Sequence, residues 1–361
     1  MVVHKWVGAR VGIMGNPSDG FGGKTIACLM RNFGAEVILR ESSTVEIVRH
    51  PLFDPLSFGS LAALEQVASH DGYYGGIRLL YATCKKFQEF CRLRGIRLPD
   101  RNFAMQYDTD IPRQVGLGGS SAIITAALHG LMEFYELTER DIPKWEQPNL
   151  ILSVETEELG IAAGLQDRVV QAHGGLVYMD FDPEYMSSNG HGIYDEMPTS
   201  LLPPLYLAWT SVPSESGKMH NDVRHRFNAG DPDVIAAIRE WAACTDEARD
   251  ALLTGDRELL GELMNHNFDL RRKLYGDDGL GRINLELINT ARSLGLTAKF
   301  AGSGGAIIGT YEDEHAYQRA AEIFTSLGYS LGKVVPGAYE PAQEAARPGV
   351  PALEPVSQQV V

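Results

Sequence analysis

Long hydrophobic runs are missing from this sequence of 361 residues. No apolar stretch approaches the roughly 20 residues that a membrane-spanning helix needs, and the N-terminus lacks the apolar core of a signal peptide. Cysteine is also scarce, and the four thiols, Cys28, Cys84, Cys91 and Cys244, form no C-x-x-C pair and no zinc spacing. We therefore expect no transmembrane helix, no membrane partner, and reduced thiols in a cytoplasmic protein.

Lysine and arginine are fewer than the acidic residues. The 32 Lys and Arg residues stand against 47 Asp and Glu residues, which gives a formal net charge of −15. Because so acidic a surface repels nucleic acid, we expect no DNA or RNA partner. Anionic ligands would need cations concentrated where they bind, and a divalent metal ion could contribute to that charge.

The chain is long and apolar enough, with 44% hydrophobic residues, for two domains of ordinary size. Strand and helix patterns are mixed without strict alternation, which indicates an α+β fold rather than a doubly wound sheet. The proline pair at 203–204 predicts a boundary between an N-terminal domain, 1–203, and a second domain, 204–340. The composition of residues 341–361, rich in Pro, Ala, Gln and Val, is typical of a disordered tail.

Local periodicity and turn signals predict the main elements. Strands are expected at 9–14, 36–40, 45–50, 102–107, 205–210 and 329–335, with two short strands around 302–305. Helices are expected at 75–94, 120–136, 141–158, 231–253, 256–275, 283–294 and 313–327.

The segment 111–122, IPRQVGLGGSSA, is the most informative stretch of the chain. It is a glycine and serine turn followed at once by an apolar helix, whose first N–H groups and positive dipole end point at one spot. It is neither a P-loop, because no Lys precedes the hydroxyl residue, nor a G-x-G-x-x-G fingerprint. It is therefore either a phosphate-binding site of another design or a flexible connection with a serine N-cap.

Two further sites carry chemistry-bearing residues. Asp167 follows a small, glycine-bearing segment and precedes Arg168, so we expect a functional carboxylate; the alternative is a helix N-cap or an ion pair with Arg168. The glycines of 302–305 lie between apolar strands. They indicate either a tight hairpin or a place where backbone meets a ligand.

In order and spacing, these sites resemble those of the GHMP kinases over about residues 8–335. The central segment is similar to the family loop P-x-G-x-G-L-G-S-S-A with one extra small residue, and Gln114 stands where a glycine is usual. Glu155 and Asp167, twelve residues apart, match the metal-binding Glu and the catalytic Asp of galactokinases. The resemblance implies a ribosomal protein S5 domain 2-like N-terminal domain and a ferredoxin-like C-terminal domain.

The segment 9–19 is similar to the galactokinase substrate motif, in which an Arg lies by the reacting hydroxyl and an Asp binds the sugar. Arg10 and Asp19 match these two residues. Asn16 and Pro17 replace an acidic residue and a histidine of that motif, so we expect a sugar other than galactose.

Within this family the chain most resembles the plant-type glucuronokinases, through phrases at 15–19, 164–180, 216–218 and 264–272. The resemblance implies ATP-dependent phosphorylation of D-glucuronate at its anomeric hydroxyl. The oligomeric state, monomer or homodimer, is not determined by the sequence. The alternatives are a kinase for galacturonate, arabinose, a heptose or another small alcohol, and a sensor that binds sugar and ATP without turnover. Loss of the metal or base residues would mark the sensor, and they are present.

The resemblance also implies residue roles, with ATP and Mg²⁺ as cofactors. The ATP phosphates would be wrapped by Gly116, Leu117, Gly118, Gly119, Ser120, Ser121 and Ala122. Ser121, together with Glu155, would hold Mg²⁺, and Ser120 is a further candidate. Asp167 would accept the proton of the sugar hydroxyl, oriented by Arg10. Substrate contacts are expected from Asn16, Asp19, Lys24, Arg168, Gly302, Ser303, Gly304 and Gly305.

A sugar acid needs a cationic partner, for which the candidates are Lys24, Arg113, Arg168 and Lys218. We rank Arg168 first because it adjoins Asp167. On a predicted helix, Asn265, Asn267 and Arg271 either face the cleft or bond between helices. His129, His173, His220 and His225 show no metal spacing and are interpreted as structural. Tyr73, Tyr74 and Trp209 either contact nucleotide or fill the core, and we favour the core.

Overall fold

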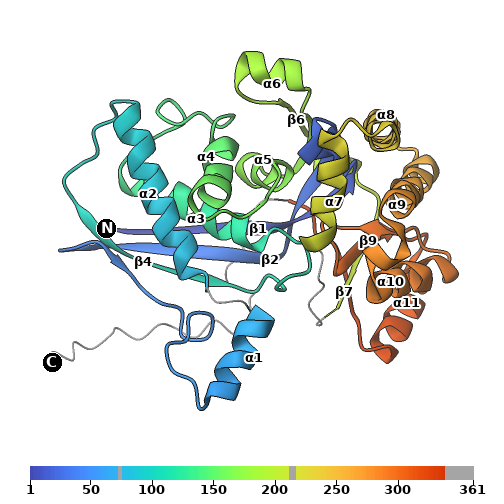
Figure 1. The fold of residues 1–361 in the computed structure, drawn as a ribbon, viewed down its shortest axis with the longest axis horizontal. Helices are drawn as coiled ribbons and strands as arrows, with labels where there is room; N and C mark the ends of the chain where they lie inside the picture. Colours follow the sequence, from blue (N-terminus) through green and yellow to red (C-terminus); the bar gives the residue numbers. More distant parts are fainter. Residues whose placement is uncertain (72–74, 211–216, 338–361) are drawn as a thin grey trace.

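A computed structural model describes residues 1–71, 75–210 and 217–337 (Figure 1), with the side chains of 69–71 and 217–222 left out of the description. The predicted tail at 341–361, the pair Tyr73-Tyr74 and the side chains of Lys218 and His220 lie outside the described residues. In the described ranges, no helix is both long and apolar enough to cross a membrane. The four cysteines are free thiols, as the sequence predicts.

The N-terminal half is built on a six-stranded sheet. Its strands are β1 (Val2–Met14), β2 (Lys24–Ser42), β3 (Glu46–Ile47), β4 (Asn102–Thr109), β5 (Leu176–Asp180) and β6 (Ile193–Met197). The order is β3-β4-β2-β5-β6, and β1 also pairs with β2. The sequence predicted only the last part of β2, because its first part is buried on both faces and shows no polar alternation.

Helices cover one face of this sheet (Figure 1). They are α2 (Ile77–Leu93), α3 (Gly119–Phe134), α4 (Gln147–Ser153) and α5 (Gln166–His173), while α1 (Leu61–Asp71) projects from the body and α6 (Pro183–Asn189) precedes β6. The helix expected at 141–158 begins only at Gln147, because Pro148 is tolerated only in a first turn, and it ends in a π turn at Val154–Glu158. Short 3-10 turns lie at Ser18–Phe21 and Thr199–Leu201.

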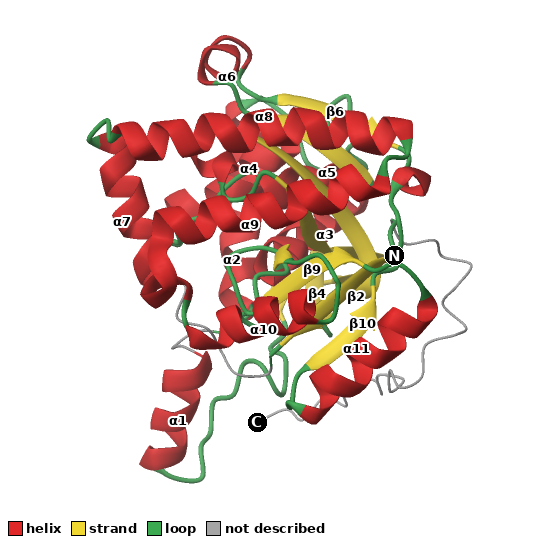
Figure 2. Cartoon of the chain, turned by 90° about the vertical axis from the view of Figure 1, so that its right-hand side faces the viewer, coloured by secondary structure: helices red, strands yellow, loops and turns green. Residues whose placement is uncertain are grey.

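The C-terminal half has a four-stranded antiparallel sheet of order β10-β7-β9-β8. Its elements are β7 (Leu205–Trp209), α7 (Gly217–Asn228), α8 (Pro232–Thr254), α9 (Arg257–Leu280), α10 (Arg282–Ser293), β8 (Lys299–Phe300), β9 (Ala306–Thr310), α11 (Glu314–Ser326) and β10 (Ser330–Lys333). Strands and helices alternate in the ferredoxin-like way, as the family resemblance implies. Figure 2 shows α8 and α9 lying side by side as long helices.

Capping explains the helix ends in this half. The Asp231 side chain accepts hydrogen bonds from the N–H groups of Asp233 and Val234, so α8 begins where the sequence predicts. Gly255 ends α8 in the left-handed conformation, with φ +73°. The range of α9 joins two helices across Gly276, whose φ of +70° and ψ of +165° are not helical, so the first of them ends at Tyr275 as the sequence predicts.

One hydrophobic cluster joins the two halves. It contains Val11 and Ile124 from the first half and Cys244 and Leu263 from the second. All strands of the first sheet precede residue 203 and all strands of the second follow it. The division into domains at 203–204 stays a prediction, and the shared core indicates that the two halves support each other.

Candidate active site

A cleft of about 620 Å³ lies where the two halves meet. Four segments contribute to its wall: the turn after β1, the loop that leads into α3, the segment before α5, and the loop between β8 and β9. Three of these contain the glycine-rich sites that the sequence singled out, so the fold brings them together from positions far apart in the chain.

The loop before α3 is shaped by glycine. Gly116 and Gly118 have φ of +70° and +72°, and Gly118 is the N-cap of the helix. The first bond of the helix runs from Ala122 N to Gly118 O, so the N–H groups of Gly119, Ser120 and Ser121 precede the ladder. This is the arrangement that binds an anion at a helix N-terminus.

Gln114 forms the first bend of this loop. Its φ of +58° is in the left-handed region, where the related motif has glycine. The bend therefore forms without glycine, at a conformational cost of roughly 1 kcal/mol.

Arg10 connects the three glycine-rich sites. Its Nε donates to Asp167 Oδ1 at 2.5 Å, and its Nη1 donates to the carbonyl oxygens of Gly116 at 2.8 Å and Ala301 at 2.9 Å. Burial alone would raise the pKa of Asp167, but the guanidinium groups of Arg10 and Arg168 hold it below its ordinary value. Asp167 is therefore ionised at neutral pH and lies within the wall of the cleft.

Glu155 faces Ser120 and Arg168. Its Oε1 accepts from Ser120 Oγ at 2.7 Å, and its Oε2 pairs with Arg168 Nη2. Ser121 is fully buried instead, and its hydroxyl donates to Gly118 O at 3.0 Å. The helix start therefore turns Ser120 and not Ser121 toward the carboxylate, and the role of Ser121 as a Mg²⁺ ligand stays a prediction. Two hard oxygen donors beside a phosphate-type loop suit Mg²⁺, which takes few protein ligands.

Two expected substrate contacts are engaged elsewhere. Arg168 lines the cleft, but it is buried, pairs with Glu155 and donates to Gly164 O at 2.9 Å. Lys24 is not part of the cleft wall, because its Nζ faces Asp246 at 2.8 Å and Asp180 at 3.4 Å. Lys24 is therefore not placed to contact a substrate in the cleft, whereas Arg168 lines the cleft as the partner of Glu155, and its substrate contact stays a prediction.

The turn after β1 places Asn16 and Asp19 in the cleft wall. Burial and the negative charge of Asp167 raise the pKa of Asp19, whose Oδ2 accepts from Gln166 N at 3.4 Å. Gly302 and Ser303 also line the cleft, and a Cβ at Gly302 would meet Gly116 O at 2.0 Å.

Gly304 and Gly305 fall outside this wall, and Gly305 N donates to Asn284 Oδ1 at 2.8 Å. The third glycine site therefore meets the first one as packed backbone, and only its first two residues reach the cleft.

Behind the cleft, buried side chains of the C-terminal half hold these turns. Lys299 was not predicted from the sequence; its Nζ donates to Gly12 O at 2.7 Å, Asn16 Oδ1 at 2.5 Å and Phe300 O at 2.8 Å. Burial, with the charges of Arg271 and Arg10, holds the pKa of Lys299 well below its ordinary value. A single apolar-flanked lysine gives no local signal of such a role.

Asn267 and Arg271 belong to the same back wall. Asn267 Oδ1 accepts from Gly15 N at 2.7 Å, and Arg271 donates to the carbonyls of Gly302 and Ser303 at 2.9 and 3.1 Å. Their side chains hold the backbone of the two turns, and the main chain of Asn267 also bonds between helices, because its carbonyl accepts from Trp241 Nε1 of α8 at 3.1 Å. Asn265 accepts from Ala298 N at 2.9 Å.

A further part of the cleft wall, termed the far end, combines aromatic, aliphatic and arginine side chains. It is lined by Phe53, Gly76, Arg78, Leu79, Tyr107, Thr109, Ile111, Pro112 and Arg113. Tyr107 donates to Asp54 Oδ2 at 2.9 Å, and the Arg113 guanidinium lies 5.6 Å from the centre of the Phe53 ring. Sequence reasoning missed most of these residues because positions 53, 76–79 and 107–109 carry no motif; only 111–113 belong to the glycine and serine segment.

The remaining expectations concern ring side chains. Trp209 packs edge-on against Phe33 at 5.4 Å, which favours the core interpretation. His129 bonds to Gln147 at 2.9 Å and His173 to Glu196 at 3.0 Å, and burial lowers the pKa of both. His225 is exposed on α7.

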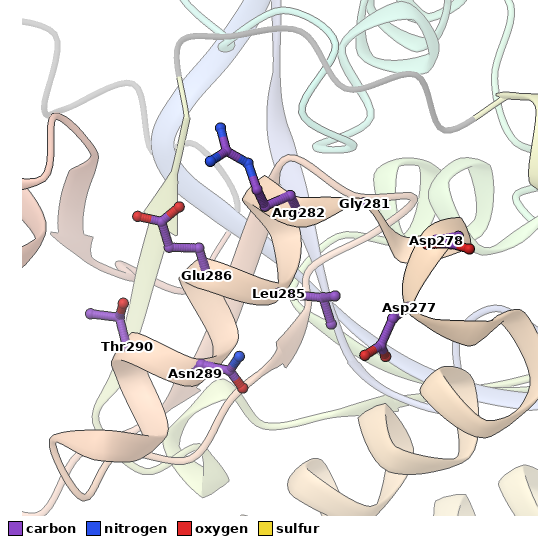
Figure 3. A pocket seen from close by; sticks show the side chains of 8 residues that line it. All are labelled: Asp277, Asp278, Gly281, Arg282, Leu285, Glu286, Asn289 and Thr290. Carbon is purple, nitrogen blue, oxygen red and sulfur yellow. The ribbon is translucent and has the colours of Figure 1, made fainter.

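A second depression lies on the outer side of α9 and α10. Figure 3 shows its side chains spreading apart rather than converging on one point. Asp277 in its wall accepts two hydrogen bonds from Arg272, at 2.6 and 2.7 Å. Nothing in this arrangement combines a nucleophile, a base and an anion site.

Comparisons with known proteins agree with this geometry. The family models described as GHMP kinases N terminal domain and GHMP kinases C terminal match residues 78–175 and 248–330. Glucuronokinase 1 of Arabidopsis thaliana is 49% identical over 301 residues, which is 83% of this chain and 82% of that protein.

Solved structures share the fold at low identity. The Lin0012 protein of Listeria innocua is 16% identical, with a TM-score of 0.73 over 92% of this chain and 97% of that one. Galactokinase of Lactococcus lactis, solved with galactose, is 17% identical, with a TM-score of 0.69 over 93% of this chain and 94% of that one.

Proposed function

Since this chain belongs to the GHMP kinase family, we propose that it transfers the γ-phosphoryl group of ATP to the anomeric hydroxyl of D-glucuronate. The products are ADP and D-glucuronate 1-phosphate. The identity of 49% to a glucuronokinase over most of both chains supports the sugar acid as substrate. The observation that carries the reaction type is the Arg10–Asp167 pair, which lies between the loop before α3 and the turn that bears Asp19.

The triphosphate fits the loop before α3. The N–H groups of Gly119, Ser120 and Ser121 precede the hydrogen-bond ladder and are positioned to receive phosphate oxygens. The far end, with Phe53 and Tyr107, suits the flat base of the nucleotide. ATP would thus extend along the cleft from this end toward Asp167.

Asp167 acts as the proton acceptor in this proposal. The anomeric oxygen forms a bond to the γ-phosphorus, the bond from that phosphorus to the β-bridging oxygen breaks, and the hydroxyl proton passes to the Asp167 carboxylate. Arg10 fixes the orientation of that carboxylate through Nε. Its positive charge also favours the negative charge of the moving phosphoryl group.

Glu155 and Ser120 would hold Mg²⁺. When bound, the ion would lessen the charge on the phosphate oxygens. Arg168 holds the Glu155 carboxylate in place, because the two side chains are buried as a pair. A cytoplasmic location, a monomeric or homodimeric state and the preference for ATP stay predictions.

A sugar panel tests the proposed function. The purified chain is incubated with ATP, Mg²⁺ and D-glucuronate, D-galacturonate, L-arabinose, D-galactose or a heptose, and ADP release is followed. We expect the highest kcat/KM with D-glucuronate and a product whose phosphate is on the anomeric carbon by NMR. A higher kcat/KM with another sugar would reassign the substrate within the same family.

A further inference from the structure

Five guanidinium groups line the cleft: Arg10, Arg78, Arg113, Arg168 and Arg224. Arg10 and Arg168 are paired with the carboxylates of Asp167 and Glu155. Arg78 and Arg113 come from the far end of the cleft, among the residues that suit the nucleotide. A negatively charged sugar beside Asp167 therefore needs a cation other than these four.

Arg224 on α7 is the fifth of these guanidinium groups. Its Nη1 donates to Gly20 O at 2.7 Å, and its guanidinium lies 4.7 Å from the centre of the Phe21 ring. Both contacts are to neutral groups, and no carboxylate among the described residues pairs with it. The ring and the carbonyl orient the guanidinium while leaving its charge for a ligand.

A chain of contacts connects Arg224 to the base. Gln166, next to Asp167, donates its N–H to Asp19, and Asp19 is followed by Gly20, whose carbonyl accepts from Arg224. The charges of Asp19 and Arg224 both act on Tyr275 of α9, so the two residues share one region of the wall. The turn after β1 therefore connects the region of Asp167 to Arg224.

We propose that Arg224 binds the carboxylate of the sugar acid and so determines the preference for uronates over neutral sugars. This inference rests on the proposed function. In a uronate ring, the anomeric carbon and the carbon that bears the carboxylate are both bonded to the ring oxygen. A sugar whose hydroxyl faces Asp167 therefore presents its acid group a short way along the same wall.

Loss of Arg224 should weaken binding of the sugar acid more than it slows the chemical step. A guanidinium–carboxylate contact is made in the ground state and the transition state alike, so its loss raises KM more than it lowers kcat. Removing a charged hydrogen bond of this kind corresponds to about a 10- to 100-fold loss of affinity.

Arg224→Gln and Arg224→Lys test the assignment, with Arg226→Gln as the matched control. Arg226 lies on the same helix and pairs with Asp231 at 2.8 Å. Kinetics are measured with D-glucuronate and D-glucose, and binding of D-glucuronate is measured by calorimetry in the presence of a non-hydrolysable ATP analogue. We expect Arg224→Gln to lose about 10- to 100-fold in kcat/KM and in affinity for D-glucuronate. Arg224→Lys should lose less, and the KM for ATP, the constants for D-glucose and the Arg226→Gln enzyme should be unchanged.

The outcomes separate the two proposals. A wild-type enzyme that phosphorylates neutral sugars but no uronate would overturn the proposed function. A wild-type enzyme that phosphorylates D-glucuronate, together with an Arg224→Gln variant of unchanged KM and affinity, would overturn the role of Arg224 alone. Equal losses for D-glucuronate and D-glucose in that variant would also overturn it, since they would show a general effect on the turn.

Discussion

Two layers of buried positive charge surround the cleft, and they are neutralised in different ways. In the front layer, Arg10 and Arg168 face the carboxylates of Asp167 and Glu155. In the back layer, Lys299 and Arg271 donate to carbonyl and amide oxygens, and no carboxylate in the described part of the chain pairs with them.

The pKa values follow this difference. Burial alone would lower the pKa of Arg168, but Glu155 and Asp167 raise it above its ordinary value. Burial lowers the pKa of Arg271 and Lys299, and nearby positive charge lowers that of Lys299 further. In the front layer, the neighbouring opposite charges thus favour the charged forms of Asp167 and Arg168. In the back layer, Lys299 and Arg271 of the C-terminal half instead hold the backbone of the turns next to the front layer.

The largest effect is expected from breaking the front layer at the base. Asp167→Asn keeps an oxygen that can accept from Arg10 but cannot take the proton, so kcat should fall roughly 10²- to 10⁴-fold. Steady-state kinetics and sugar binding by calorimetry check this, and the sugar should still bind. Asp246→Asn, which alters the Lys24 pair away from the cleft, is the control. Near-normal turnover in Asp167→Asn would favour catalysis by the metal alone.

The other pair of the front layer should affect stability more than specificity. Arg168→Gln leaves the buried Glu155 carboxylate without its cation, so the free energy of unfolding should fall by about 3 kcal/mol in urea titrations. The preference for D-glucuronate over D-glucose should persist, because we assign the sugar acid group to Arg224. Arg249→Gln, which removes a half-exposed pair with Asp195, should cost less than about 1 kcal/mol. Collapse of the preference would return Arg168 to the substrate.

Lys299 tests whether the back layer behaves differently. In Lys299→Met three buried oxygens lose their donor, which should cost about 1–3 kcal/mol in the free energy of unfolding. The wild-type lysine has a lowered pKa when folded, so between that pKa and the usual 10.5 the unfolded chain binds the proton more readily. The contribution of Lys299 to the free energy of unfolding therefore rises with pH between its lowered pKa and 10.5.

The contribution of Lys299 is isolated by comparing how the free energy of unfolding changes with pH in the wild type and in Lys299→Met. Urea unfolding of the wild type and of Lys299→Met is measured at several pH values on the alkaline side of neutrality. The wild type should gain stability relative to the variant as the pH rises. Parallel curves for the two proteins would mean that Lys299 has an ordinary pKa when folded.

The smallest effect concerns the loop that lies between the layers. Gln114→Gly removes a side chain from a left-handed residue and should raise the free energy of unfolding by at most about 1 kcal/mol. Gly118→Ala is the opposite control: its φ is +72°, and an added Cβ would lie 3.2 Å from Arg10 Cγ. Thermal unfolding should show changes of opposite sign, and a loss of stability in Gln114→Gly would contradict the strain at that bend.

Much of the fold could be predicted from local patterns. Asp231 and Gly255 marked the ends of α8, and the glycine turn at 116–118 marked the start of α3, because caps and turns depend on residues close in sequence. The first part of β2 escaped prediction because a strand buried on both faces lacks the alternation that identifies it.

The site was predictable in its motifs but not in every side chain. Asp167 and Arg10 face each other as the family resemblance implies, whereas Ser120 and not Ser121 meets Glu155. A helix turns by about 100° per residue, so a shift of one position in its start decides which serine faces the cleft. No sequence pattern sets that start to one residue.

The sequence by itself determined the family, the two sheets and the three glycine-rich sites, because these depend on residue order and local backbone preference. Only the tertiary structure decided which cation faces which partner: Lys24 and Arg168 toward internal carboxylates, Lys299 toward carbonyls, and Arg224 toward the open cleft. The reason is that a charge is stabilised by whatever lies within a few ångströms of it, and those neighbours come from segments that the chain brings together only when it folds.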